Sequence, residues 1–406
     1  MRSLRGLDRP LLGLILLVLL AGLIVLYAAS AKVAAGAQGA SGHLLLRRLV
    51  QIALGLAFLG VAALADPRWI RRAAFPAAVA SAALLLWVLG APMIKGTRGW
   101  IFVGGFTIQP VDAARVGLLV FMADRLALRE AMSGWRRFLP AAIALAAGVL
   151  LVALQPDFGS ALALGLSGAC VLIAARPPWR WLALAVLAGV LMVGALYLGS
   201  DRIRQRVDLT LHFDASENSA ENYQLRQSLI GIGAGGGFGQ GAGRNRQRIF
   251  LPDHHTDFIF AIVGEEYGFF GASVLLALLA ALSLRVLGIA GRQADPFARY
   301  LAAGVGGMLF VYTAMNVAVT LGLFPLTGVP LPFVSHGGSA LVMHLLALGL
   351  VLSVSRAEAG RPVQAARRSL IPRRRRLEPV AEDLFSRAGR RGAEPPLKRA
   401  RRAAGR

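Results

Sequence analysis

The chain has 406 residues, of which 56% are hydrophobic and 16% are charged, and its mean hydropathy is +0.61. Soluble domains carry about 25% charged residues, so this composition excludes an ordinary soluble enzyme. The formal net charge is +23, and the segment from Arg356 onward holds 16 of the 44 Lys and Arg residues. The single cysteine, Cys170, excludes an intrachain disulfide.

Apolar runs long enough to cross a bilayer recur along most of the chain. A membrane span needs roughly 20 mostly apolar residues. The first run is too long for a signal-peptide core, so we interpret it as a retained span. We expect an all-α polytopic membrane protein with about ten transmembrane helices, a membrane domain at 1–355 and one large extracytoplasmic loop at 200–256. The spans are predicted near 11–30, 46–65, 74–94, 107–124, 138–154, 159–175, 179–199, 257–284, 298–322 and 337–355.

Basic residues are distributed unequally between the two sides that ten spans define. The side with both termini holds 31 Lys and Arg residues, the other side holds 12, and Arg115 lies within a span. Basic residues favour the cytoplasmic side, so both termini are predicted to be cytoplasmic. The tail, 356–406, is polar and basic. We expect it to be disordered and to act as a topology determinant on anionic lipid, not as a nucleic-acid-binding segment.

The stretch "LPDHHTDFIFAIVGEEYG", 251–268, places ionisable residues at the start of the eighth span and within it. On a helix that begins at Asp257, Glu265 and Glu266 lie roughly 12 Å deeper. Ionisable groups at such depth are costly and mark a pathway or an internal ion pair. Arg115 lies at a similar depth in the fourth span. We therefore expect Arg115 to pair with Asp257, with Glu265, or with both.

Two further stretches on the same predicted side have alternative interpretations. In "LQPDFGS", 154–160, Asp157 is either the N-cap of the sixth span or a second carboxylate near Asp257. In "GIGAGGGFGQGAGRNRQR", 231–248, the glycine backbone forms either a concavity for a phosphate-bearing ligand, with three arginines following, or a flexible loop.

The stretch "LFPLTGVPLPFVSHGGS", 323–339, interrupts apolar sequence with prolines and glycines. Irregular backbone within a membrane is tolerated only where it is buried or lines a cavity. Its polar side chains, together with Asn316, are Ser335 and His336. His336 taken alone is either a satisfied structural histidine or a member of a site.

A metal site in "DHHTD", 253–257, is disfavoured by its spacing. His254 and His255 are adjacent, so one helix face cannot present both. Asp257 together with phosphate oxygens would still suit Mg²⁺ or Mn²⁺, and a divalent cation therefore stays open as a cofactor.

These motifs, in this order, resemble the SEDS family (shape, elongation, division and sporulation) of bacterial cell-wall polymerases, which includes FtsW and RodA. The runs "HTDFIFA" and "PLPFVSHGGS" carry most of the likeness, which covers the whole membrane region and leaves out the tail. "YQLRQSL" and "FIFAIVGEE" are more similar to the division type than to the elongation type.

The resemblance implies a peptidoglycan glycosyltransferase that polymerises lipid II at the outer face of the bacterial cytoplasmic membrane. It also implies a class B penicillin-binding protein as partner, together with other division or elongation proteins. The family's essential aspartate falls on Asp257. An elongation-type polymerase, a lipid II flippase and a scaffold for division proteins are the alternatives. The polar residues cluster toward the outside, which favours the polymerase over the flippase.

Two positions depart from the family's pattern. The usual Gln-Pro-Ser-Glu with a later lysine is Gln109, Pro110, Val111 and Asp112 with Arg115 here, and this excludes proton transfer by a lysine. The usual Ser-Tyr-Gly-Gly begins Ser335-His336 here, which removes any role that needs a phenol.

We predict that Asp257 is the general base, because a sugar hydroxyl must lose its proton as it attacks. Glu265 and Glu266 are assigned to structure and to tuning Asp257 through Arg115. The predicted substrate-binding residues are Lys95, Arg98, Arg115, Gln155, Asp157, Arg244, Arg246, Arg248, His255, Asn316, Ser335 and His336.

Overall fold

The computed structural model describes residues 6–30, 40–94, 96–103, 106–211, 220–244 and 257–370. The chain divides into two compact units, Met1–Glu358 and Ala359–Arg406. The helices of the described part are α1 (Arg9–Ser30), α2 (Ala40–Leu64), α3 (Pro67–Arg72), α4 (Ala74–Val88), α5 (Pro110–Leu128), α6 (Leu139–Ala153), α7 (Phe158–Ala174), α8 (Trp179–Gly199), α9 (Asp201–Leu211), α10 (Ala220–Gly235), α11 (Ile259–Arg292), α12 (Pro296–Thr320) and α13 (Gly338–Leu370), with a 3-10 turn, η2, at Trp135–Arg137.

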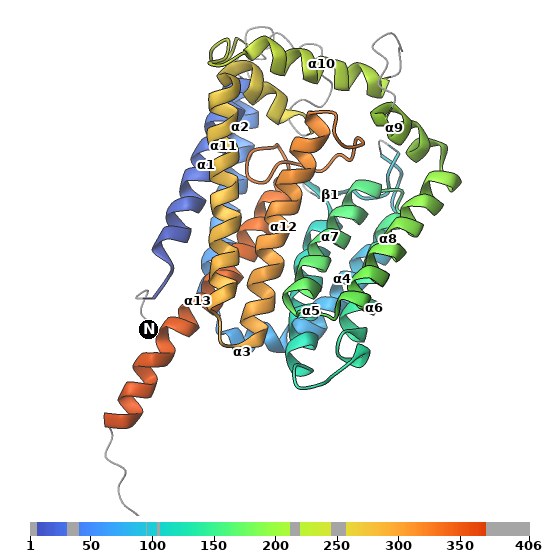
Figure 1. Cartoon of the computed structure of the whole chain (residues 1–406). Helices are drawn as coiled ribbons and strands as arrows, with labels where there is room; N and C mark the ends of the chain where they lie inside the picture. The colour runs from blue at the N-terminus through green and yellow to red at the C-terminus, as the bar shows by residue number, and fades with distance from the viewer. Residues whose placement is uncertain are drawn as a thin grey trace, which may run out of the picture. The chain divides into compact units, whose positions relative to one another are not determined.

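Helices occupy all ten positions at which the sequence predicts spans (Figure 1). Six of them, α1, α2, α8, α11, α12 and α13, are long and apolar enough to cross a membrane. Three more, α4, α6 and α7, are apolar but shorter, and α5 carries charged residues at both of its ends. The prediction of an all-α polytopic membrane protein is confirmed.

Helix α12 lies at the centre of the bundle, where it packs against α5, α7 and α11. Small residues allow the close approach: a Cβ on Gly304 would lie 2.6 Å from the side chain of Val171 on α7. Such small-residue faces are typical of helix packing in membranes. Helix α8 differs, because none of its residues is buried. The core therefore forms around α12, with α8 at its margin.

A short hairpin precedes α5 and was not predicted. Strands β1 (Ile101–Val103) and β2 (Phe106–Ile108) pair antiparallel, with Phe102 opposite Thr107. Because the hairpin occupies the residues before it, the helix of the fourth span starts at Pro110, whereas the sequence predicted a start at 107. The "VGGF" sequence between two short apolar runs was a usable hairpin signal.

The predicted extracytoplasmic loop, 200–256, contains helices α9 and α10 in its described part. Helix α10 is fastened to α12, because the buried Ser228 hydroxyl donates to the Thr320 carbonyl at 2.8 Å. This region is therefore a structured layer over part of the bundle (Figure 1).

Helix α11 is interrupted near its start. Gly268 has φ 66° and ψ −167°, which is not helical and suits glycine. The amides of Phe269 and Phe270 donate across the break to the carbonyls of Gly236 and Gly237. The first segment of α11, with Glu265 and Glu266, thus lies against the end of α10. The predicted depth of these glutamates assumed one straight helix from Asp257, whereas α11 is broken at Gly268.

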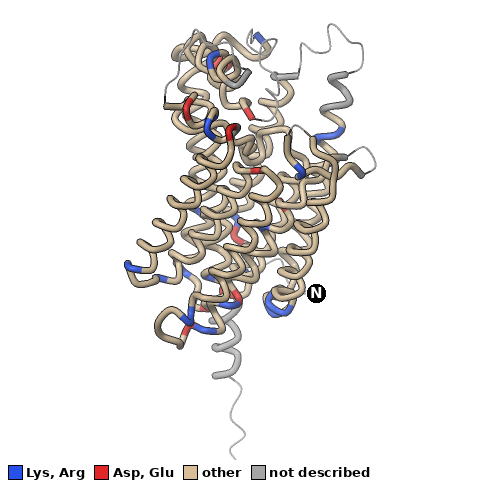
Figure 2. Tube along the Cα trace, turned by 90° about the vertical axis from the view of Figure 1, so that its right-hand side faces the viewer, with Lys and Arg blue, Asp and Glu red and all other residues tan. Residues whose placement is uncertain are grey.

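Two groups of segments mark the two ends of the bundle. We call one the loop end; it carries the hairpin, the α6–α7 turn, α9, α10 and the segment 321–337 (Figure 1). The other we call the basic end, since Lys and Arg gather there around the chain's N-terminus (Figure 2). Its ion pairs include Arg285 with Asp8 and Arg71 with Asp124.

The last helix extends further than predicted. Helix α13 continues to Leu370, whereas the span was expected to end at 355. In the sequence, the boundary between the two compact units falls after Glu358, close to position 356, where the tail was predicted to begin. The basic runs of the tail, in 371–406, lie outside the described residues.

Candidate active site

The first turn of α5 carries a buried ion pair. Arg115 Nη2 lies 3.2 Å from Asp112 Oδ1, and the two side chains are 2% and 3% exposed. The Ser339 hydroxyl donates to the other oxygen of Asp112 at 2.7 Å. The Arg115 guanidinium also lies over the Tyr312 ring, 4.2 Å from its centre. Both charges therefore have partners inside the bundle.

The predicted partner of Arg115 is wrong. The carboxylate is Asp112 on the same helix, not Asp257 or Glu265. Residues three apart share one helix face, so Arg115 needs no partner from another helix. The tuning of Asp257 through Arg115, which was predicted for the two glutamates, loses its basis with this pairing.

The start of α7 joins the α5 pair through Gln109. The Asp157 carboxylate accepts from the Ser160 amide at 3.0 Å, so Asp157 is the N-cap of α7. Its second oxygen accepts from the Gln109 side-chain amide at 3.1 Å. Gln155, which precedes this cap, is 1% exposed and donates to the Leu85 carbonyl at 3.1 Å. Its amide is thus directed to α4, away from any open surface.

The segment 321–337 lies between this cap and Asp257. A Cβ on Gly159 would overlap the Thr327 carbonyl, so α7 packs directly on the segment. A Cβ on the next residue, Gly328, would lie 3.7 Å from Asp257 Oδ2. One short backbone stretch therefore contacts the start of α7 at Thr327 and lies beside the Asp257 carboxylate at Gly328.

Asp257 is half-buried and immediately precedes α11. The buried Asn316 side chain on α12 donates to the Asp257 carbonyl at 3.0 Å and to the Val329 carbonyl at 2.9 Å. Asn316 was predicted to bind substrate. In the structure its amide group fixes the backbone of Asp257 to the segment 321–337.

Ser335 closes a turn within the same segment. Its hydroxyl accepts from the Leu331 amide at 2.8 Å, and its amide donates to the Leu331 carbonyl at 3.1 Å. Ser335 is 3% exposed, so it holds the segment's shape. Next to it, His336 is half-buried. Burial lowers the pKa of His336 below its ordinary value, and the charges of Arg48 and Arg47 lower it further.

Sequence reasoning missed Arg48. This residue of α2 is fully buried and donates to the Ser335 carbonyl at 3.0 Å and to the Phe333 carbonyl. Its position within an apolar run was the available signal, because a charge in a span is costly. The count of basic residues in the sequence places Arg48 at the edge of the second span, among the 12 of the side without the termini.

The glycine-rich stretch is a packing element. A Cβ on Gly235 would overlap the Gly264 carbonyl on α11. The amides of Gln240 and Gly241 donate to the carbonyls of Glu265 and Glu266 at 2.9 and 3.0 Å. The Gly243 amide donates to the Glu266 carboxylate at 3.1 Å.

These contacts favour a packing role for the described part of the stretch, 231–244, over an anion-binding concavity or a flexible loop. Glu266 has the structural role predicted for it, through the glycine backbone and not through Arg115.

The remaining residues that were predicted to bind substrate lie either at the loop end or outside the described residues. Arg98 and Arg244 are exposed, and Arg98 donates to the Leu89 carbonyl at 3.0 Å. Lys95, Arg246, Arg248 and His255 lie outside the described residues.

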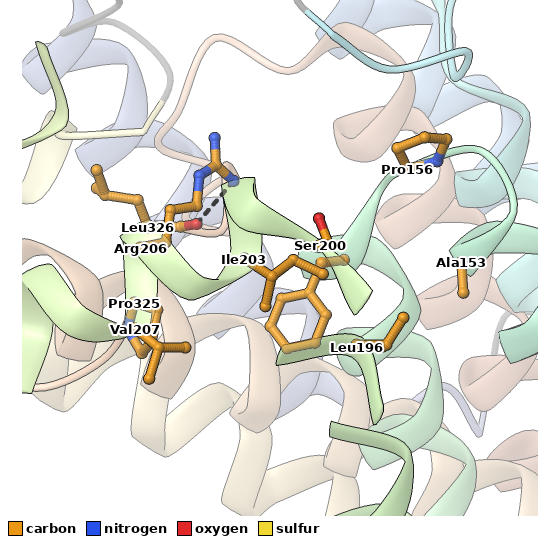
Figure 3. Close-up of a pocket in the computed structure, with 10 residues that line it drawn as sticks. Ala153, Pro156, Leu196, Ser200, Ile203, Arg206, Val207, Pro325 and Leu326 are labelled. Carbon is orange, nitrogen blue, oxygen red and sulfur yellow. Dashed lines mark hydrogen bonds between the residues drawn. The ribbon is translucent and has the colours of Figure 1, made fainter. Parts of the chain in front are cut away.

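A small apolar pocket opens beside the site, between the α6–α7 turn, α8, α9 and the segment 321–337 (Figure 3). Its volume is about 50 Å³, which is room for a few atoms and not for a sugar. Arg206 donates to the Leu326 carbonyl at 3.0 Å on its rim. Leu326 lies two residues before Gly328, so the pocket adjoins the segment 321–337 beside the start of α7. The lining residues are Ala153, Pro156, Phe158, Leu196, Ser200, Ile203, Arg206, Val207, Pro325 and Leu326.

Among the described residues, no group of three or more His, Cys, Asp or Glu side chains is placed to hold a metal ion. The histidines of "DHHTD" lie outside that part of the chain. The expectation of a divalent cation stays a prediction.

Comparison with known proteins gives one family. The model of the FtsW, RodA and SpoVE family, described as "Cell cycle protein", matches residues 9–360. The "Probable peptidoglycan glycosyltransferase FtsW" of Geobacter sulfurreducens is 31% identical over 348 residues, covering 84% of this chain and 93% of the relative. The "Peptidoglycan glycosyltransferase MrdB" of Escherichia coli is 35% identical over 345 residues, covering 84% and 92%.

A solved structure shares the fold. It is described as "Structural coordination of polymerization and crosslinking by a peptidoglycan synthase complex" and superposes with a TM-score of 0.73 at 30% identity. The superposition covers 87% of this chain and 99% of the other.

Proposed function

We propose, because the chain belongs to the cell cycle protein family of FtsW, RodA and SpoVE, that Asp257 is the general base of a peptidoglycan glycosyltransferase. The enzyme polymerises lipid II into glycan strands. The observation that carries the role of Asp257 is how the residue is positioned. Asn316 fixes its backbone, and its half-buried side chain lies beside Gly328.

The reaction joins two sugars. An acceptor hydroxyl forms a bond to the anomeric carbon of the donor, and the bond from that carbon to undecaprenyl pyrophosphate breaks. The hydroxyl proton passes to the Asp257 carboxylate, a transfer that contributes typically 10²–10⁴-fold to the rate. The leaving group departs as a pyrophosphate, so no protein acid is required.

Negative charge on the departing pyrophosphate needs stabilisation. Arg98 and Arg244 are exposed at the loop end and are suited to this role. Lys95, Arg246 and Arg248 lie close to them in sequence and are proposed to join them. A divalent cation held by pyrophosphate oxygens would supply the same stabilisation.

The substrate's lipid and sugar parts require a site at the membrane surface. The apolar pocket is lined by Leu326, two residues before the Gly328 that faces Asp257. We propose that the prenyl chain approaches from this side and that α8, which has no buried residue, moves to admit it. Basic residues at the opposite end of the bundle support cytoplasmic termini and an external loop end (Figure 2).

A lipid II flippase is the alternative function. Such a transporter requires polar groups along a path between both faces. Here the polar groups around Asp112, Asp157 and Asp257 gather at the loop end. A buried hydrophobic cluster also joins α5, α7, α11 and α12. This distribution favours the polymerase.

The partner is proposed to be a class B penicillin-binding protein, since the similar solved structure belongs to a peptidoglycan synthase complex. The division-type assignment rests on "YQLRQSL" and "FIFAIVGEE". Relatives of both types match at 31% and 35% identity. Localisation of a fluorescent fusion at the septum would support the division type, and localisation along the side wall would support the elongation type.

The function is tested with purified protein, its transpeptidase partner and lipid II, with glycan strands resolved on a gel. Asp257→Asn keeps the size of the side chain and removes the base, so strand formation should fall by about 10²–10⁴-fold. Asp295→Asn is the matched control, since Asp295 lies before α12 and makes no side-chain cap bond. Near-parental polymerisation by folded Asp257→Asn would rule out the mechanism and favour the flippase.

A further inference from the structure

A fully buried cation on α2 lies at the segment that faces Asp257. Arg48 is 0% exposed, whereas its neighbour Arg47 is partly exposed. Arg48 lies within the apolar window Leu45–Leu64, which is suited to cross a membrane. Arginine keeps its charge there, and such residues in membrane helices usually serve a function. The mechanism above does not use Arg48.

The contacts of Arg48 are with backbone of the segment 321–337. Nη1 donates to the Ser335 carbonyl at 3.0 Å, and Nη2 donates to the Phe333 carbonyl. This segment has no helical ladder to satisfy its carbonyls, so buried carbonyls need outside donors. Phe333 has φ 65°, a left-handed conformation that side-chain-bearing residues rarely adopt. Arg48 thus holds the segment at the point where its backbone is least favourable.

The turn between these carbonyls and Val329 is internally fixed. The Leu331 amide donates to the Ser335 hydroxyl at 2.8 Å, and the Ser335 amide donates to the Leu331 carbonyl at 3.1 Å. A displacement at Phe333 or Ser335 is therefore transmitted toward Val329.

At Val329 the segment meets Asn316. One side-chain amide group of Asn316 donates to both the Val329 carbonyl and the Asp257 carbonyl, at 2.9 and 3.0 Å. Gly328, one residue earlier, faces the Asp257 carboxylate. The contacts run from α2 through the turn to α12 and to Asp257.

We infer that Arg48 is a positioning residue: it holds the 331–335 turn, and through Val329 and Asn316 it sets the place of Asp257. The inference rests on the proposed role of Asp257. Misplacement of a catalytic group by about 1 Å can cost 10²-fold in rate. Loss of Arg48 should therefore affect the chemical step more than the binding of lipid II.

The test compares Arg48→Met, which keeps length and removes the donors, with Arg285→Met. Arg285 pairs with Asp8 at 2.7 Å at the basic end, so its variant controls for general loss of an arginine contact. Full-length proteins in detergent are compared by hydrogen exchange of the amides in 329–337. Initial polymerisation rates over a range of lipid II concentrations then give kcat and KM.

Arg48→Met should expose the amides of Leu331, Val334 and Ser335 to faster exchange. Its kcat should fall by about 10- to 100-fold while KM stays within about threefold. Arg285→Met should keep parental exchange in the turn and parental kcat, even if its thermal midpoint falls. Parental exchange in Arg48→Met, or faster exchange with parental kcat, would overturn the inference. Equal losses of kcat in both variants would also overturn it, since they would indicate general destabilisation.

If Arg48→Met does not fold, the same measurements on Arg48→Lys test the inference. A lysine keeps the charge but cannot reproduce the guanidinium's fork of donors, so intermediate losses are expected and parental values would overturn the inference. If the parent protein makes no glycan, the proposed function fails separately. Hydrogen exchange then still decides whether Arg48 holds the turn.

Discussion

Asp112 and Asp257 are two carboxylates at the same end of the bundle with opposite surroundings. Asp112 is 3% exposed at its side chain, and its two oxygens contact Arg115 and Ser339 at 3.2 and 2.7 Å. Asp257 is half-buried and is fixed through its backbone carbonyl by Asn316. A carboxylate with both oxygens engaged by buried partners is held by them, and the removal of one partner is costly. Asp257 is held at its backbone carbonyl, which positions its side chain for the proposed chemistry.

The largest expected effect follows from breaking the Asp112–Arg115 pair. Arg115→Ala leaves a buried carboxylate without its cation and should cost about 3–5 kcal/mol in the free energy of unfolding. The double variant Asp112→Leu with Arg115→Met should recover most of that loss, because an apolar pair replaces an ion pair. Thermal unfolding in detergent measures both.

Asp257→Asn provides the contrast in the same measurement. It should unfold at a midpoint close to the parent's while losing polymerisation. If Asp257→Asn were as unstable as Arg115→Ala, the distinction between a structural and a chemical carboxylate would fail.

A smaller effect is expected at the backbone stretch between the two sites. In Gly159→Ala the new Cβ meets the Thr327 carbonyl, so α7 or the segment 321–337 must shift. Overpacking of this kind costs typically about 1–3 kcal/mol, and activity should fall with it because Gly328 faces Asp257. Gly13→Ala on α1 is the control, since nothing lies within 4 Å of its Cβ. Equal stability and activity of the two variants would show that the contact at Thr327 is dispensable.

A smaller effect still is expected from acidification through His336. Its pKa is lowered in the folded protein by burial and by Arg48 and Arg47. The unfolded chain, with a histidine pKa of about 6.5, then binds more protons than the folded one, so stability is full above that pH and falls as pH decreases below it.

The thermal midpoint should therefore drop between pH 7.5 and 5.5, by about 2 °C more in the parent than in His336→Asn. Identical pH dependence in both proteins would show that His336 is not held in its neutral form. Such a result would also weaken the case that the positive charge of Arg48 acts on this part of the site.

No effect on catalysis is expected from the basic tail. Residues 371–406 are polar, and helix α13 ends before them at Leu370. Deletion of 371–406 should leave the rate of strand formation in detergent within about twofold of the parent, because surface changes away from a site are usually near neutral. A well-folded deletion variant without activity would place part of the machinery in the tail.

The site was partly predictable, and the limits have a physical cause. Asp257 stood out because a polar run leads directly into an apolar helix. Asp157 stood out as an N-cap because its position before a span matches cap chemistry. Arg48 was overlooked because charge at the end of a span resembles a topology signal. Its role depends on which way α2 is rotated, and hydropathy does not give that rotation.

The sequence alone determined the number and position of the apolar helices, since their length and composition are local properties. It also identified the family through its local motifs. The tertiary structure decided which charges meet. It paired Arg115 with Asp112, broke α11 at Gly268 against the glycine-rich turn, and brought Arg48 to the segment that faces Asp257. These contacts depend on helix rotation and on close backbone approach between residues distant in the chain, and no local pattern encodes either.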